Sequence, residues 1–423
     1  MEEQLLHFIW HRRLFSGEEL KTTTGEPLVI LHTGTPNLDQ GPDFLQSRIR
    51  IDEQVWAGHI EIHIRSSAWY LHMHEHDSHY NNVILHVVWE EDQPAMTQDG
   101  YRIPCLELSG RVDRSLLDRY RRLMNNQEWV PCGSALSDVP GIVKTAWLER
   151  LMAERLESKA GMILRILERF QYDWEQVFYI MLARQLGVPA NGEAMEELAI
   201  RIPLRLLLKH KDRPDQMEAL LFGAAGMLEK EIQHPYPVHL KREFEFQALK
   251  YHIRPMQALH WKFLRMRPAH FPSLRIAQLS AILIQSDGFV SLIESHPSVD
   301  DWIRMFTVSP SDPFWDTHYH FTHEAPRASK RLGKHTAQAL LINVVAPLMF
   351  IYGKHQGKAA LKEHAPSLLG QLEPEKNAIL SGWKTCGWVA RDAGQSQALL
   401  HLRKQYCERK RCLHCAIGLQ VLK

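Results

Sequence analysis

The architecture of this chain is set by residues 41–64, whose sequence is GPDFLQSRIRIDEQVWAGHIEIHI. Residues 44–51 predict a β-strand, residues 52–54 a turn, and residues 55–64 the returning strand of a hairpin, because apolar runs flank a turn signal. The alternation is cleanest in the second strand, where isoleucines face a core and polar side chains face the other way. The two sets are Ile60, Ile62 and Ile64 on one face, and His59, Glu61 and His63 on the other.

Three side chains of this hairpin form a candidate catalytic and metal site. If the turn centres near Glu53, Asp43 lies roughly opposite His63 and Glu61 lies one step away on the same face, to within about two residues of register. Cross-strand neighbours are roughly 5 Å apart, so Asp43 and Glu61 can share a divalent cation. Oxygen ligands suit Mg²⁺ or Mn²⁺, and such an ion can stabilise charge on a phosphate and activate a water molecule.

This hairpin resembles the core of the PD-(D/E)XK nuclease superfamily, in which a Pro-Asp opens one strand and an acidic-x-Lys triplet lies on the next. The corresponding residues here are Pro42-Asp43 and Glu61-Ile62-His63. The order of elements also agrees, with a helix over residues 4–15, a strand over 27–32, the hairpin, and a nearly continuous apolar strand over 81–89. The resemblance covers only the N-terminal part of the chain. It implies a restriction-endonuclease-like fold and metal-dependent nuclease activity.

One position departs from that superfamily, because His63 stands where its members have a lysine. A lysine is a permanent cation beside the attacking water and the phosphate. A histidine can be a cation, a general base or a metal ligand, depending on its pKa. Both an active nuclease of altered mechanism and an inactive relic therefore stay open.

The whole chain also resembles an uncharacterised bacterial family known only as a domain of unknown function. Four segments carry this resemblance: Gly41-Pro42-Asp43-Phe44, Val83-Ile84-Leu85-His86-Val87-Val88, Ala219-Leu220-Leu221-Phe222-Gly223 and Cys412-Leu413-His414-Cys415-Ala416-Ile417-Gly418. That family carries no established activity, so this resemblance implies a single evolved unit and no particular substrate.

A histidine-rich segment over residues 69–80, WYLHMHEHDSHY, follows the hairpin. In a nuclease-like core it would be the second helix or a loop that replaces it, and His72, His74 or Asp77 could overhang the hairpin site as metal ligands. Imidazoles favour a softer ion such as Mn²⁺ or Zn²⁺. The alternative is a solvated polar loop. His86, on the expected buried strand, is better explained as a core histidine with satisfied hydrogen bonds.

Length and charge bound the function only loosely. The chain has 423 residues, too many for one typical domain, and a net charge of +1. A charge near zero is no global signature of nucleic-acid binding, so local patches would have to supply it. The N-terminus lacks a signal peptide's basic region, and the longest apolar run, residues 336–352, is short for a membrane span. We therefore expect a cytoplasmic protein that does not span a membrane.

The predicted fold class is α+β, an N-terminal mixed sheet with flanking helices followed by a large, mostly α-helical region. The expected parts are a nuclease-like core over residues 1–110, a helical domain over 111–236, a second helical subdomain over 237–405 and a cysteine-containing tail over 406–423. Periodicity and capping residues predict the main helices, which span residues 113–125, 143–170, 173–186, 215–233, 240–252 and 272–285. The Pro-Tyr-Pro at 235–237 predicts a break and a junction between subdomains.

Two basic groups in the helical region are candidate contacts for nucleic-acid phosphates. The first holds Arg265, Arg267 and Arg275, with Arg254 and Lys262 nearby, and the second holds Lys330 and Arg331, with Arg327, Lys334 and His335 nearby. The alternative is an ordinary solvated surface, since acidic residues nearly balance basic ones along the chain.

The tail contains a candidate metal site formed by Cys407, Cys412 and Cys415. With Cys386 or His414 as a fourth ligand, these thiolates would suit Zn²⁺, and four cysteines would suit Zn²⁺ or an iron–sulfur cluster. A redox-active pair at Cys412 and Cys415 and a set of buried thiols are the alternatives.

Three functions remain open from the sequence. The first is a metal-dependent nuclease that hydrolyses phosphodiester bonds of nucleic acid through Asp43, Glu61 and His63. The second is a non-catalytic module on a degenerate nuclease scaffold that binds nucleic acid or protein. The third is a small-molecule metal hydrolase centred on the histidine-rich segment. The chain has neither a nucleotide-binding glycine loop nor a Gly-x-Ser-x-Gly motif, which argues against ATP hydrolysis and serine-esterase chemistry.

Overall fold

The computed structural model describes residues 1–228, 234–257 and 260–423 of the chain. It divides into two compact units. The sheet unit comprises residues 1–144 together with residues 404–423, and the helical unit comprises residues 145–403. The expected boundary near residue 110 therefore moves to residue 144, because the first helix after the sheet and the tail both belong to the same compact unit as the sheet. The helical region forms one unit without a division near residue 236.

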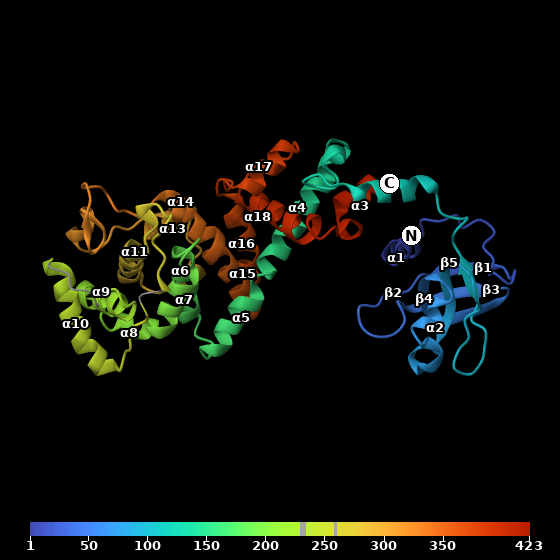
Figure 1. Cartoon of the computed structure of the whole chain (residues 1–423), viewed down its shortest axis with the longest axis horizontal. Coiled ribbons are helices and arrows are strands. Elements are labelled where there is room, and N and C mark those ends of the chain that lie inside the picture. The colour runs from blue at the N-terminus through green and yellow to red at the C-terminus, as the bar shows by residue number, and fades with distance from the viewer. Residues whose placement is uncertain (229–233, 258–259) are drawn as a thin grey trace. The chain divides into compact units, whose positions relative to one another are not determined.

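The sheet unit is built on a mixed β-sheet, so the expected α+β class is confirmed (Figure 1). The strand order is β1-β3-β4-β5-β6, with β2 paired to β3. The strands are β1 (Leu28–His32), β2 (Thr35–Pro36), β3 (Phe44–Ile51), β4 (Gln54–Arg65), β5 (Val83–Glu90) and β6 (Cys105–Glu107). β1, β3 and β4 pair antiparallel, whereas β4, β5 and β6 pair parallel. Six consecutive buried residues open β5, as expected for a parallel strand that is covered on both faces.

The hairpin of β3 and β4 forms as expected, but its register differs near Asp43. Ile51 pairs with Gln54 and Ser47 with Gly58, whereas Phe44 pairs with Ile60. Two residues of β3, Leu45 and Gln46, therefore lie opposite one residue of β4, which defines a β-bulge. Gln46 adopts a left-handed φ of 58° in this bulge. With Ile51 paired to Gln54, an unbroken register would place Asp43 opposite Ile62, and the bulge moves it one position further, beside Glu61. Asp43 therefore lies two positions from its expected partner, His63.

Short helices complete the sheet unit. They are α1 (Glu3–Arg12), α2 (Ala68–Leu71), the 3-10 turns η1 (His74–His76) and η2 (Ser78–Tyr80), α3 (Arg114–Asn125), η3 (Gly133–Asp138), η9 (Cys412–His414) and α19 (Ala416–Leu422). α1 packs against β4 through its buried apolar face. α19, from the far end of the chain, packs on α3, where Arg119 Nε donates a hydrogen bond of 3.0 Å to the carbonyl of Leu422.

The helical unit contains most of the remaining helices, and the division between the units falls inside α4. They are α4 (Gly141–Glu157), α5 (Ala160–Arg169), α6 (Trp174–Leu186), α7 (Gly192–Arg201), α8 (Leu204–Leu208), α9 (Pro214–Ala224), α10 (Pro235–Tyr251), η5 (Pro268–His270), α11 (Pro272–Gln285), α12 (Phe289–Glu294), α13 (Val299–Phe306), η6 (Pro313–Asp316), α14 (Lys334–Leu340), η7 (Leu341–Val345), α15 (Ala346–His355), α16 (Ala359–Gly370), α17 (Ala378–Thr385), α18 (Ala393–His401) and η8 (Leu402–Cys407), with a small hairpin of β7 (His318–His320) and β8 (His323–Glu324).

Three helix predictions need correction. The helix expected over residues 143–170 is two helices, because the chain leaves the helix at Ser158. The helix expected over 215–233 ends at Ala224, and residues 229–233 lie outside the described residues. The expected break at residues 234–237 is the start of α10, since Pro235 occupies the first helical turn, where its missing N–H costs nothing.

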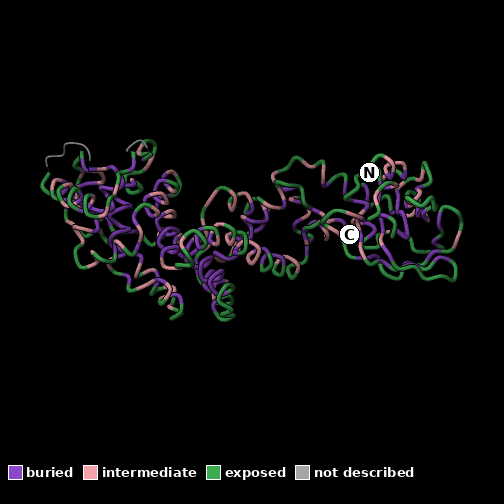
Figure 2. Tube along the Cα trace, turned by 90° about the horizontal axis from the view of Figure 1, so that it is seen from below, coloured by how far each residue is buried: buried purple, intermediate pink, exposed green. Residues whose placement is uncertain are grey.

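The long apolar segment from Lys334 to His355 has the length and composition of a membrane-crossing helix, but 83% of its most apolar window is buried inside the protein. Its side chains join the core of the helical unit, which runs from Leu156 to Ala393. Buried residues, drawn in purple along the trace in Figure 2, continue through the interior of this unit. The segment is therefore part of the buried core of the helical unit.

Candidate metal centre

The carboxylates of Asp43 and Glu61 are each fixed by a backbone amide of the opposite segment of the hairpin. Glu61 Oε2 accepts a hydrogen bond of 3.1 Å from the amide of Asp43, and Asp43 Oδ2 accepts one of 2.9 Å from the amide of Ile62. The side chain of Glu61 is 6% exposed and that of Asp43 is 24% exposed. The bulge in β3 and the alternation of β4 thus bring together the acidic pair that the sequence predicted.

Two imidazoles meet at the other carboxylate oxygen of Glu61, and a third lies against one of them. Glu61 Oε1 lies 3.5 Å from His63 Nε2 and 3.2 Å from His74 Nε2, and His63 Nε2 lies 3.1 Å from His72 Nδ1. One ring nitrogen from each of His63, His72 and His74 lies within 4.8 Å of the others. We call these three residues the histidine group. They include two of the three residues that the sequence singled out in the histidine-rich segment.

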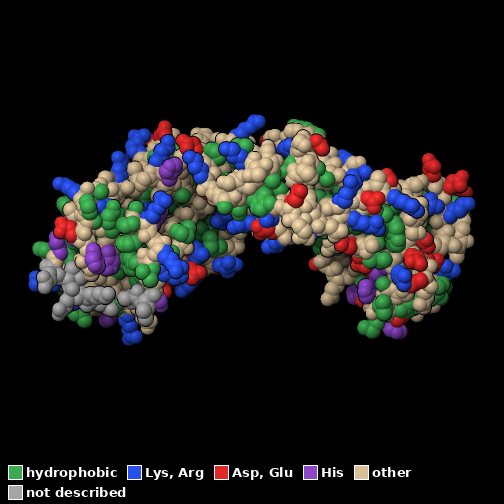
Figure 3. Space-filling model, turned by 45° about the horizontal axis from the view of Figure 1, so that its top comes forward, with side chains coloured by type: hydrophobic (Ala, Val, Ile, Leu, Met, Phe, Trp, Pro, Cys, Tyr) green, Lys and Arg blue, Asp and Glu red, His purple; other side chains and the backbone are tan. Residues whose placement is uncertain are grey.

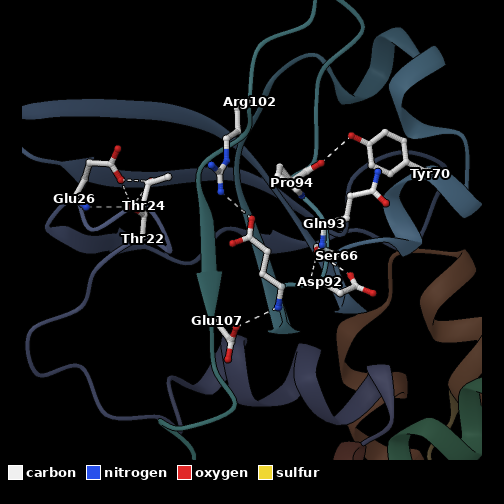
Figure 4. A network of polar contacts seen from close by, with 11 residues as sticks. Thr22, Thr24, Glu26, Ser66, Tyr70, Asp92, Gln93, Pro94, Arg102 and Glu107 are labelled. Atoms are coloured by element: carbon white, nitrogen blue, oxygen red, sulfur yellow. Dashed lines mark hydrogen bonds and ion pairs between the residues drawn. The ribbon is translucent and has the colours of Figure 1, made fainter.

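A polar network holds that segment over the sheet. Asp92, just after β5, accepts hydrogen bonds of 3.0 Å from Ser66 Oγ and 2.8 Å from both the amide and the hydroxyl of Ser67. Ser66 Oγ accepts in turn from the amides of Asp92 and Gln93, and Tyr70 donates to the carbonyl of Pro94 (Figure 4). β4 therefore ends at a fixed point, from which α2 turns back across the sheet.

A residue with a left-handed backbone conformation then sets the positions of His72 and His74 relative to each other. Met73, with φ of 57°, separates α2 from η1 and reverses the chain between His72 and His74. Tyr80 stacks on the ring of His74 at 3.8 Å between centroids, and the fully buried Trp69 contacts its edge. These aromatic walls restrict the rotamers of His74 and hold Nε2 toward Glu61.

Two further histidines support the centre, and the sequence did not identify their roles. His86 Nε2 lies 2.9 Å from His63 Nδ1, so this buried histidine of β5 orients the ring of His63. His7 Nε2 on α1 lies 3.4 Å from Asp43 Oδ2. The sequence indicated only that His86 lies on a buried strand, and it did not indicate the contact with His63. His7 is separated from Asp43 by a helix and two strands, so only the fold could reveal that contact.

Burial controls the protonation of the centre. Burial, with the charge of Asp43 as the second cause, raises the pKa of Glu61 to about 9. Burial and the neighbouring histidines lower the pKa of His63 to about 2, and burial lowers the pKa of His74 as well. Burial opposes protonation of His7, but its hydrogen bond with Asp43 and the charge of that carboxylate outweigh it, so the pKa of His7 is raised. His63 and His74 therefore offer neutral imidazole lone pairs at neutral pH.

The spacing of these atoms fits a metal ion. Two ligands bonded at about 2.1 Å to one ion, at octahedral or tetrahedral angles, lie about 3.0–3.4 Å apart. The three close contacts around Glu61 Oε1 and His63 Nε2 measure 3.1, 3.2 and 3.5 Å. Among the described residues, His74 Nε2 is buried without a hydrogen-bond partner. A buried nitrogen in this state is costly unless a ligand satisfies it. Three imidazoles and one carboxylate suit Zn²⁺, Mn²⁺ or Fe²⁺ better than Mg²⁺.

Other predicted site residues lie elsewhere. Asp77 caps η2, where its Oδ1 accepts hydrogen bonds from the amide and the ring of His79, so that oxygen is engaged outside the histidine group. In the tail, Cys412 and Cys415 are buried neighbours, and Cys407 is half-buried. Burial and the adjacent Cys415 raise the pKa of the Cys412 thiol to about 11. Metal binding by this tail stays a prediction.

The two basic groups are only partly available to a ligand. Arg275 is buried with hydrogen bonds to Gln278 and His270, and burial lowers its pKa to about 10. Lys330 is buried with its ammonium over the ring of Tyr319. Both are therefore structural, contrary to expectation, because the helical core surrounds their stems. Arg265, Arg267 and Arg331 are exposed. On the face drawn in Figure 3, basic and acidic side chains are interspersed.

Comparison with known proteins identifies a family and no characterised relative. No curated protein and no solved structure matches the chain. One family model matches residues 3–378, which is most of the chain. The expected membership of an uncharacterised family is therefore confirmed: the chain belongs to the family described as "Protein of unknown function (DUF2851)".

Proposed function

We propose that this protein is a metal-dependent hydrolase that cleaves phosphodiester bonds of nucleic acid at the centre formed by Asp43, Glu61 and the histidine group. The observation that carries the proposal is that two buried imidazoles, His63 and His74, lie beside one buried oxygen of Glu61, with a third imidazole, His72, next to His63, all at ligand-to-ligand distances. Such a set is expensive to bury unless a cation occupies it.

Each residue has a distinct role in this proposal. Glu61, His63 and His74 are buried and would hold the ion firmly, whereas His72 is exposed and marks the side from which a substrate can approach. The ion, when bound, would polarise a phosphoryl oxygen and lower the pKa of a water molecule. Asp43 is partly exposed beside His7, so this pair can accept or return a proton at the open side of the centre.

The choice of phosphodiesters rests on the arrangement of the sheet. Pro42-Asp43 enters one strand of an antiparallel hairpin, Glu61-x-His63 lies on the next, and β5 runs parallel beside it. This arrangement is similar to the PD-(D/E)XK nuclease core. His63 is not a substitute for the cationic lysine of that superfamily, because burial keeps its imidazole neutral. It is better suited to the role of a ligand.

The test is cleavage of single- and double-stranded DNA and RNA with Mn²⁺, Zn²⁺ or Mg²⁺. We expect Asp43→Asn and Glu61→Gln to lower the metal-dependent rate by about 100-fold or more, since each removes a carboxyl group that can be a negatively charged ligand once an ion displaces its proton. Asp52→Asn is the matched control, because Asp52 lies in the turn of the same hairpin, away from the centre. Equal activity in all four proteins would reject the proposal.

A second candidate is a metal hydrolase for a small substrate, and the depth of the centre favours it. His63 is 1% exposed and Glu61 is 5% exposed, so little of the centre is accessible to a bulky duplex. A small chromogenic phosphodiester, assayed with the same variants, separates the two. Turnover of this compound without cleavage of any nucleic acid would support the second candidate. Nucleic-acid binding without turnover of either substrate would support a binding module.

A further inference from the structure

A second site lies in the helical unit, where the chain forms a cavity of about 600 Å³ between the ends of α7, α8 and α10. That volume falls in the range typical of small-ligand sites, roughly 300–1,000 Å³. Nine residues line it, and none of them is acidic. The polar lining residues are Arg201, Arg205, Lys209, Tyr251, His252 and Arg254.

Most of this positive charge has no acidic partner. Arg201 donates to Glu197 Oε1 at 2.8 Å and to the carbonyl of Arg254 at 2.9 Å, so it holds the wall of the cavity together. Within the described parts of the chain, no ion pair joins Arg205, Lys209 or the guanidinium of Arg254 to a carboxylate. All three side chains are exposed. Three cations thus line one concavity, two from α8 and its C-cap and one from the segment after α10.

Like charges collected in a hollow repel one another, and low-dielectric walls concentrate their field on any anion that enters. The chain as a whole is balanced, with 50 basic and 49 acidic residues, so this excess is local. Arginine offers paired N–H donors that match phosphate oxygens. Carboxylates are weaker candidates, because one carboxylate cannot neutralise three cations. The chemistry of the cavity is therefore that of a phosphate site.

The cavity also contains one aromatic ring, that of Tyr251, on which a nucleobase could stack. Tyr251, at the end of α10, is half-buried in the lining, and its hydroxyl lies 3.1 Å from His210 Nε2. Its ring is therefore held in place before a ligand arrives. Sites for single-stranded nucleic acid combine a positive groove with aromatic rings on which bases stack.

We propose that this cavity binds the phosphate groups of a single nucleic-acid strand through Arg205, Lys209 and Arg254. The cavity extends the proposed function, on which the choice of a nucleic acid rests, by assigning a substrate-holding role to the helical unit. The phosphate chemistry rests on the cavity alone.

Binding of a fluorescein-labelled single-stranded oligonucleotide, followed by anisotropy in EDTA, tests the proposal without any turnover. We expect the double variant Arg205→Glu/Lys209→Glu to weaken binding by about tenfold or more at low salt, and to reduce the salt dependence, because about 0.7 counterion is released per neutralised phosphate. The matched control is Lys362→Glu/Lys376→Glu, which changes the net charge equally at exposed positions of the same unit. The control is expected to bind like the wild type.

Several outcomes would overturn the assignment. Wild-type binding by both double variants, or equal weakening of both, would show that the cavity has no special role. Competition by a mononucleotide or inorganic phosphate as strong as that of an oligonucleotide would assign the cavity to a free phosphate compound. Because the binding assay needs no metal, a failed cleavage experiment would not contradict the assignment of the cavity as a nucleic-acid site. Likewise, cleavage that survives in the cavity variant would not contradict the assignment of the metal centre.

A folding control accompanies the binding assay. Circular dichroism, and the milder Arg205→Ala/Lys209→Ala variant, check that a loss of binding does not result from a loss of folding.

Discussion

His74 gives the sharpest test of the centre at the scale of one residue. Its ring is clamped between Tyr80 and Trp69, and its Nε2 points at Glu61 Oε1 from 3.2 Å. We expect His74→Gln to weaken Zn²⁺ or Mn²⁺ binding by about 100-fold or more, since loss of even a supporting residue costs about 10–100-fold in metal affinity. Equilibrium dialysis followed by elemental analysis measures the bound metal.

The same segment supplies the control for that experiment. His76 lies two residues along, its side chain is 76% exposed, and it pairs only with Glu75. His76→Gln should therefore retain the wild-type metal content. A histidine-rich loop that binds metal nonspecifically would lose similar amounts in both variants, and that result would contradict a defined centre.

Glu218 predicts how stability depends on pH. This residue of α9 is 1% exposed, and its Oε2 accepts a hydrogen bond of 2.8 Å from Tyr236. Burial raises the pKa of Glu218 from 4.5 to about 8. Between these two values the folded protein keeps a proton that the unfolded chain releases, so the free energy of unfolding must fall as pH rises. Below pH 4.5 this contribution is fully present, and above about 8 it is lost.

Glu218→Gln removes this titration, because an amide keeps the hydrogen bond with Tyr236 and has no proton to lose. Urea midpoints at several pH values, followed by tryptophan fluorescence, compare the two proteins. We expect the wild type to lose stability relative to the variant between pH 5 and 8, by an amount on the order of a few kcal/mol. Parallel pH profiles would show that Glu218 is ionised in the folded protein throughout.

At the scale of elements, helix packing depends on one glycine. A Cβ atom on Gly223 of α9 would lie 2.0 Å from the ring of Phe244, so α10 can approach α9 only where no side chain intervenes. Gly223→Ala should destabilise the helical unit by about 1–3 kcal/mol through overpacking. Gly161→Ala on exposed α5, where the nearest atom is 3.8 Å away, should instead stabilise it by up to about 1 kcal/mol. Thermal denaturation measures the change in stability of each variant. Destabilisation by both substitutions would refute the packing argument.

The strands and most helices could be predicted because their signals are local. Apolar runs on both sides of a turn signal located β3 and β4, and alternation marked the second half of β4. Asp173, at the start of the helix expected over residues 173–186, caps α6 through the amide of Gln176. The bulge at Gln46 has no such signal, because a glutamine with positive φ is held there by the strands on either side rather than by its own preference. The sequence therefore predicted the pairing of Asp43 with Glu61 only to within two residues of register.

At the scale of the whole molecule, the boundaries were hard to predict because the sheet unit uses both ends of the chain. A change of hydrophobic period marks where strands give way to helices, near residue 108, but α3 still packs with the sheet. The return of residues 404–423 is a non-local contact that no pattern in the tail announces. Conversely, the predicted junction at residues 234–237 was inferred from prolines, which begin helices as readily as they end them.

This two-ended construction predicts that the C-terminus stabilises the N-terminal unit. Ile417 and Leu422 of α19 are 1% and 3% exposed, and burial of two such side chains contributes on the order of 3–6 kcal/mol. That is a large share of a domain's stability, about 5–15 kcal/mol. A chain ending at Arg403 should therefore show much faster hydrogen exchange in α3 but unchanged exchange in α11 of the helical unit. Removal of the exposed Lys423 alone should change neither helix, and unaltered exchange of α3 in the shorter chain would mean that the sheet unit folds without its tail.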